Sequence, residues 1–123
     1  MQANGGGTII NMASIAGMVA GGGGIAYTTA KHAIVGFTKQ LALDVADQGI
    51  SVKGIAPGAI QTPMNAADFE GKGEMAQWVA EETPVKRWAQ PEEVAALTLF
   101  LASPQASYLQ GAIVPIDGGW TLK

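Results

Sequence analysis

The feature that most constrains this chain is a strand, a long helix and a second strand that follow one another in its first half. Residues 8–13 are short, apolar and rich in β-branched side chains, which predicts a buried strand. Residues 26–47 predict a helix that ends at Gly49, because apolar residues recur at helical spacing (Ala30, Ile34, Phe37, Leu41 and Val45). Residues 50–56, stopped by Pro57-Gly58, predict the second strand. Together they predict a βαβ unit on a parallel sheet.

The second half predicts one more helix and one more strand. Pro91, followed by two acidic residues, is typical of a helix start, and Ser103-Pro104 predicts its end. Residues 112–116 predict a last strand. Pro115 cannot donate a backbone hydrogen bond, so we expect this strand at an edge of the sheet.

Ser14, Tyr27 and Lys31 form a candidate proton-transfer set. Ser14 follows the first predicted strand, at the end where open α/β sheets place their ligands. Tyr27 and Lys31 are four residues apart on the predicted helix, so their side chains share a face. A free tyrosine has a pKa of about 10, and acting as a base near pH 7 requires its phenolate to be stabilised by about 4 kcal/mol. One ammonium about 4 Å away supplies roughly that much at an effective dielectric constant of about 20.

These residues resemble the active centre of a known family. Ser14 followed by Tyr27-Thr28-Thr29-Ala30-Lys31 is similar to the Ser…Tyr-x-x-x-Lys centre of the short-chain dehydrogenases/reductases. Residues 57–62 are similar to the family's Pro-Gly-x-x-x-Thr segment, and Asp117-Gly118-Gly119 to its closing turn. The resemblance covers essentially the whole chain but only the carboxyl-terminal half of a family member. The branch it resembles most is the 3-oxoacyl-carrier-protein reductases.

The resemblance implies an α/β fold, the carboxyl-terminal part of a Rossmann-type doubly wound parallel sheet with three strands, two long helices and a helical lid over residues 64–89. It implies hydride transfer between NAD or NADP and a carbonyl or secondary alcohol, with an acyl-carrier-protein thioester as one candidate substrate. Tyr27 is then the acid/base, Lys31 its activator and ribose anchor, and Ser14 the group that holds the substrate oxygen. The cofactor-binding residues implied are Tyr27, Lys31, Pro57, Gly58, Ile60 and Thr62. Full-length members imply a homotetramer.

Several secondary expectations accompany this reading. Met75, Trp78 and Val79 predict a short amphipathic helix in the lid, either packing it onto the body or contacting substrate. We expect Gly21–Gly24 to act as a flexible connector, with shaping of the substrate mouth as the alternative. We expect His32 at the surface and Arg87 in a local ion pair. Trp120 is expected as an interface or core anchor, with substrate contact as the alternative. Lys53 replaces the family's usual Asn, so hydrogen bonding near the site should differ.

Composition excludes several function classes. The chain has 123 residues, 48% of them hydrophobic, and a net charge of −3, which indicates a globular domain without the clustered Lys and Arg that nucleic-acid binding needs. It has no Cys and one His, too few ligands for a zinc site, so no metal is expected. No apolar run is long enough for a membrane span. The lack of Cys fits a reducing cytoplasm, the predicted location.

An alternative function is that the chain is a truncated, catalytically inactive fragment or an association module of such an enzyme. The family's glycine-rich dinucleotide turn lies upstream of this region, and the sequence contains no phosphate-binding glycine motif. The amino-terminal dinucleotide-binding half is therefore expected to be absent. The first strand would then expose an apolar edge that aggregates or recruits a partner.

Overall fold

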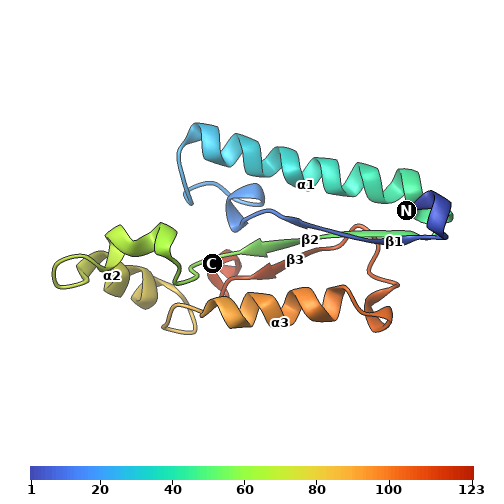
Figure 1. Cartoon of the computed structure of the whole chain (residues 1–123). Coiled ribbons are helices and arrows are strands. Elements are labelled where there is room, and N and C mark those ends of the chain that lie inside the picture. The colour runs from blue at the N-terminus through green and yellow to red at the C-terminus, as the bar shows by residue number, and fades with distance from the viewer.

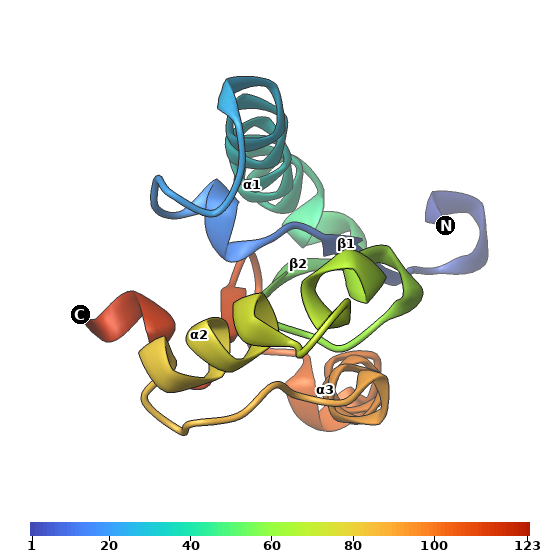
Figure 2. The same cartoon turned by 90° about the vertical axis from the view of Figure 1, so that its left-hand side faces the viewer.

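The computed structural model describes residues 1–123 as a three-stranded parallel sheet with one long helix on each face (Figure 1). Seen along the strands, α1 and α3 lie on opposite sides of the sheet, and α2 lies beyond one end of it (Figure 2). The elements in chain order are β1 (Gly7–Met12), α1 (Ile25–Val45), β2 (Ile50–Pro57), α2 (Glu74–Glu82), α3 (Pro91–Leu101) and β3 (Ile113–Ile116). The α/β fold with three parallel strands is confirmed.

The strand order is β1-β2-β3, so β2 is the central strand. β1 pairs with β2 from Gly7 opposite Ile50 onward, and β2 pairs with β3 from Gly54 opposite Ile113 onward. Pro115 therefore lies on an edge strand, as predicted, where its missing N–H removes no ladder bond. The other edge of β1 has no strand beside it.

The core lies on both faces of β2. Ile50 and Val52 pack with Ala42 of α1 on one face. Ile55 packs with Leu101 of α3 on the other face. A parallel sheet covered by helices on both faces buries its central strand almost completely, and Val52 and Ile55 are both fully buried.

The side of α1 that faces the sheet differs in part from the predicted stripe. Thr38 and Ala42 are its buried residues. Ile34, Leu41 and Val45 are half-buried beside them, whereas Ala30 and Phe37 are exposed, Phe37 by 60%. The prediction was wrong for these two residues because a polar residue, Thr38, takes the central position. Thr38 donates to the Ile34 carbonyl and accepts a 2.9 Å hydrogen bond from Asn11 of β1.

Lys53 is the largest fully buried side chain. Its Nζ donates to the backbone carbonyls of Leu101 and Ala106, at 3.1 and 2.7 Å, so it binds the carboxyl end of α3. Cations suit this end of a helix, whose last carbonyls lack partners, although burial lowers the pKa of Lys53. This end of α3 lies opposite the carboxyl ends of the strands, so the hydrogen bonds of Lys53 lie away from the predicted site.

Residues 63–89 form a separate helical layer beyond the end of the sheet (Figure 1). A 3-10 segment, Pro63–Phe69, precedes α2, and Trp88 ties the layer together by stacking on Phe69 and donating to the Ala76 carbonyl. The short helix was predicted, but its apolar side is not packed away: Met75 and Trp78 are 54% and 52% exposed. Only Ala76 of α2 is buried, and its carbonyl is the acceptor for Trp88.

The turn after β1, Ile15–Gly17, lies directly against α1. A Cβ built on Gly17 would come within 2.6 Å of the Lys31 carbonyl oxygen and 2.9 Å of the Val35 side chain. No side chain other than hydrogen fits there without moving the helix or the turn.

We expect Gly17→Ala to lower the free energy of unfolding by about 1–3 kcal/mol, because the added methyl group overpacks this contact. Gly36→Ala is the matched control on the open side of α1, where no atom lies within 4 Å. It should raise stability by about 0.5–1 kcal/mol through helix propensity. Urea unfolding at constant pH measures both. Equal stability of Gly17→Ala and the wild type would contradict the contact.

Candidate functional site

Ser14 lies at the carboxyl end of β1 and is 8% exposed. Its Oγ accepts a 3.1 Å hydrogen bond from the Ala16 backbone N–H, so it caps the turn that follows. Because this bond uses a lone pair, the hydroxyl proton stays free for another acceptor. Ser14 is thus a fixed hydrogen-bond donor at the strand end.

Tyr27 and Lys31 lie in the first two turns of α1, on the face toward this strand end. The Lys31 Nζ is 5.5 Å from the centre of the Tyr27 ring, which is 43% exposed. A Cβ on Gly23 would come within 2.6 Å of the ring atom Cδ1 of Tyr27. The glycine stretch is therefore more than a connector, because its backbone packs against the tyrosine.

The segment after β2 brings the second group of predicted residues to the same edge. Ile60 is 8% exposed and forms an isolated parallel bridge with Ala89. Asn65 donates a hydrogen bond to the Ile60 carbonyl. A Cβ on Gly58 would meet Asp117 at 2.9 Å. Gly58 is therefore required by the packing of this loop on the end of β3.

Two adjoining cavities occupy this edge of the sheet. One, of about 380 Å³, is lined by all seven predicted site residues: Ser14, Tyr27, Lys31, Pro57, Gly58, Ile60 and Thr62. The other, of about 280 Å³, shares Ser14, Tyr27, Gly58 and Asn65 with the first and is otherwise walled by the glycine stretch and the tryptophans. Ser14 and Tyr27 therefore stand where the two cavities meet.

Sequence reasoning missed several residues of this edge. Asn65, Trp88 and the close-packed Gly17 were not assigned, and they carry no motif that marks them. Trp78, for which two roles were open, lines the second cavity. Trp120 lines it too and is half-buried, which favours the alternative of substrate contact. Gly21 and Gly22 line the cavity as well, which favours the alternative that this stretch shapes its mouth.

The arrangement suits proton transfer to an oxygen at the junction of the two cavities. A tyrosine and a fixed serine hydroxyl line both cavities, and the lysine lies one helical turn from the tyrosine.

In residues 1–123, no three His, Asp or Glu side chains gather closely enough to hold a metal ion. His32 is exposed, as expected, and its Nδ1 lies 3.0 Å from the Thr28 carbonyl.

A protein-family model described as "Enoyl-(Acyl carrier protein) reductase" matches residues 1–121. The chain belongs to the short-chain dehydrogenase/reductase family. It is 43% identical over 116 residues to a short-chain dehydrogenase of Aspergillus ruber, covering 94% of this chain and 42% of that protein. It is 40% identical over 113 residues to a 3-oxoacyl-[acyl-carrier-protein] reductase of Aquifex aeolicus, covering 92% of this chain and 44% of that protein.

Solved structures of the family share the fold. A gluconate 5-dehydrogenase from Burkholderia cenocepacia, in complex with NADP and tartrate, superposes with a TM-score of 0.92 at 33% identity. The match covers 99% of this chain and 48% of that protein. The short-chain dehydrogenase/reductase chain described here thus spans about half the length of the relatives it matches. None of its helices is long and apolar enough for a membrane span.

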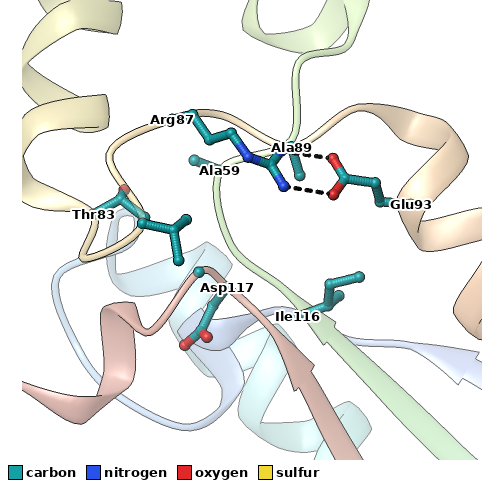
Figure 3. Close-up of a pocket in the computed structure, with 9 residues that line it drawn as sticks. Ala59, Thr83, Arg87, Ala89, Glu93, Ile116 and Asp117 are labelled. Carbon is teal, nitrogen blue, oxygen red and sulfur yellow. Dashed lines mark hydrogen bonds and ion pairs between the residues drawn. The ribbon is translucent and has the colours of Figure 1, made fainter.

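A third cavity, of about 180 Å³, lies between the α2–α3 connection and the end of β3 (Figure 3). Its cation is already paired, because the two guanidinium nitrogens of Arg87 each donate at 2.9 Å to a carboxylate oxygen of Glu93. The carboxylate also accepts from the Gln90 N–H and so caps α3. The predicted local pairing of Arg87 is confirmed, and this cavity has a structural role.

The hydrogen bonds from Arg87 and Gln90 lower the pKa of Glu93 to about 2, from a usual value near 4.5. Its stabilising contribution is therefore present above about pH 4.5 and is lost as the pH falls toward 2. We expect Glu93→Gln to be less stable than the wild type at pH 6, with a gap that shrinks on acidification. Glu92→Gln, in the same helical turn, is the control and should show no such convergence. Urea unfolding at pH 6, 4 and 2.5 measures the stability of each protein. A stability difference between Glu93→Gln and the wild type that does not change with pH would contradict this role of Glu93.

Proposed function

We propose that this chain carries the catalytic half of an NAD(P)-dependent oxidoreductase that transfers hydride between NAD(P)H and a carbonyl or secondary alcohol. The observation that carries the proposal is the single cavity lined by Ser14, Tyr27, Lys31 and the segment 57–62. Membership of a dehydrogenase family agrees with it. The preference between NAD and NADP stays open, because the family settles it in a segment upstream of these residues.

The residues present fit the nicotinamide-ribose end of such a cofactor. The Lys31 ammonium suits ribose hydroxyls, and the Thr62 hydroxyl with the backbone around Ile60 suits a carboxamide. Pro57 and Gly58 form the floor of the same cavity. Residues 1–123 offer no site for the pyrophosphate of the cofactor, because they contain no glycine-rich phosphate turn. The upstream half of a longer protein would supply it.

In the proposed reduction, the Ser14 hydroxyl donates a hydrogen bond to the substrate carbonyl oxygen. The Tyr27 hydroxyl donates a hydrogen bond to the same oxygen and transfers its proton to that oxygen as negative charge develops there. The Lys31 ammonium stabilises the phenolate that remains. A bound NAD(P)H would supply a hydride for the carbonyl carbon, which would leave the secondary alcohol and NAD(P)⁺. In the oxidation, Tyr27 takes the hydroxyl proton.

Within the family, reduction of a 3-oxoacyl-carrier-protein thioester is one candidate reaction, supported by the Aquifex aeolicus relative. Residues 64–89 would then act as the lid over the substrate, consistent with their position beyond the end of the sheet. The proposal includes a cytoplasmic location and a homotetramer in the complete protein. No contact with nucleic acid or a membrane is part of it.

Tyr27→Phe removes the proton donor and keeps the ring that packs on Gly23. In a protein that includes the upstream half, we expect the rate of NAD(P)H-dependent carbonyl reduction to fall by roughly 10²–10⁴-fold. Tyr108→Phe is the matched control, because Tyr108 is 101% exposed and lies outside the cavities, and its rate should be unchanged. The oxidation of NADPH, followed by absorbance, measures both. Near-normal turnover of Tyr27→Phe would remove Tyr27 from the mechanism.

A second candidate function, an inactive fragment or association module, is favoured by one observation. β1 has an edge without a strand partner. An open edge of this kind is a template for pairing with another chain.

We expect residues 1–123 alone to show no saturable binding of NADPH, because only the nicotinamide-ribose end has a site. Titration calorimetry with the purified 123-residue chain tests this. The control is the same titration with the longer protein, which should saturate. Saturable binding to the short chain would contradict the module reading and show that these residues hold the cofactor unaided.

A further inference from the structure

The second cavity has an unusual wall. The chain contains three tryptophans, and all three, Trp78, Trp88 and Trp120, line this cavity together with Tyr27. They come from three separate segments: α2, the connection before α3, and the turn after β3. Ser14 lines the same cavity, so its wall combines the hydroxyls of Ser14 and Tyr27 with aromatic rings and the mostly apolar remainder of the lining.

The aromatic wall is held in place before any ligand arrives. Trp88 donates to the Ala76 carbonyl at 2.8 Å and stacks on Phe69. The Trp78 and Trp120 rings meet nearly edge to face, with centres 6.5 Å apart. The turn that carries Trp120 is fixed by Asp117, whose carboxylate accepts from the backbone N–H groups of Gly119 and Thr121.

The cavity offers no cation to a ligand. Apart from Tyr27, none of its twelve lining residues is ionisable. The ammonium of Lys123 lies 4.2 Å from the centre of the Trp120 ring and is paired with Glu82 at 3.1 Å. Lys31 lines the adjoining cavity and is absent from this one. A carboxylate or phosphate placed among the tryptophans would lose water without gaining a counter-charge.

The volume limits the ligand as well. An apolar cavity of about 150 Å³ holds one benzene ring. At about 280 Å³, this one holds one or two fused six-membered rings beside the serine and tyrosine. Flat or chair-shaped rings match rigid indole walls better than a flexible polyhydroxy chain does, since the chain's hydroxyls would find few partners there.

We propose that this cavity selects uncharged carbocyclic secondary alcohols and ketones of one or two rings, with the oxygen at Ser14 and Tyr27 and the rings packed against the wall that the tryptophans form. The reaction on such a ligand rests on the proposed function; the ring selectivity rests on the cavity alone. Anionic sugar acids and carrier-bound thioesters are the competing ligand classes.

Binding is tested first, by tryptophan fluorescence, because every tryptophan of the chain lies in this cavity. The probes are 2-decalol, with two fused rings, and D-gluconate, an acyclic polyhydroxy anion. We expect 2-decalol to shift the emission saturably and to bind at least tenfold tighter than gluconate. No shift with 2-decalol, or gluconate binding as tightly, would overturn the proposal.

Variants locate the binding. Trp78→Ala and Trp120→Ala should each weaken 2-decalol binding at least fivefold. The matched control is Phe100→Ala on α3, a residue 48% exposed outside the cavity, which should bind as the wild type does. Trp78→Arg keeps a helix-compatible side chain at an exposed position and should reverse the preference toward gluconate. Circular dichroism confirms that each variant is folded, and unchanged binding in Trp78→Ala and Trp120→Ala would overturn the assignment.

Turnover separates this inference from the proposed function. The longer protein is assayed with NAD⁺ and NADP⁺ on both alcohols. If 2-decalol binds but neither alcohol is oxidised, the proposed function fails and the ring-selective cavity stands. If gluconate is oxidised with the higher kcat/KM, the proposed function stands and the inference fails. Preferred oxidation of 2-decalol, lost in Trp78→Arg, supports both.

Discussion

The contact between the turn Ile15–Gly17 and α1 determines the position of the other site residues. It places the backbone after β1 against the Lys31 carbonyl at a separation that only glycine permits. Ser14 begins this turn, and Tyr27 lies one helical turn before Lys31, so one backbone contact fixes a strand end and a helix start relative to each other. Atoms held this closely need little further ordering before they act, which reduces the entropic cost of reaching a reactive geometry.

The same edge of the sheet carries two chemically different cavities. The side toward Lys31 and the segment after β2 carries an ammonium, hydroxyls and backbone groups. The side toward the tryptophans carries aromatic rings and no cation. A polar dinucleotide and a less polar substrate would therefore meet only at the Ser14–Tyr27 boundary. The division of roles follows from where the charges lie, whichever alcohol is finally oxidised.

The sequence predicted what local spacing determines. The βαβ unit, the edge position of Pro115 and the pairing of Arg87 each depend on residues close in the chain or on a single missing N–H. The spacing of apolar residues did not identify which side of α1 faces the sheet. That side is centred on the polar Thr38, whose hydrogen-bond partner Asn11 lies 27 positions away in the chain. The burial of the Lys53 side chain depends on hydrogen bonds to the carbonyls of Leu101 and Ala106, which lie 48 and 53 residues further along the chain. The tryptophan wall joins three segments that no periodicity connects.

The selectivity proposed for the aromatic cavity depends on the absence of a cation as well as on the presence of the indole rings. Burying an unpaired carboxylate costs several kcal/mol, even after relaxation and water penetration. Burying apolar ring surface gains only about 25 cal/mol per Å². The missing cation therefore adds a penalty for an acid to the gain that the indoles give a ring. The ammonium of Lys123 lies 4.2 Å from the centre of the Trp120 ring but is paired with Glu82, so the discrimination against an acid depends in part on this ion pair.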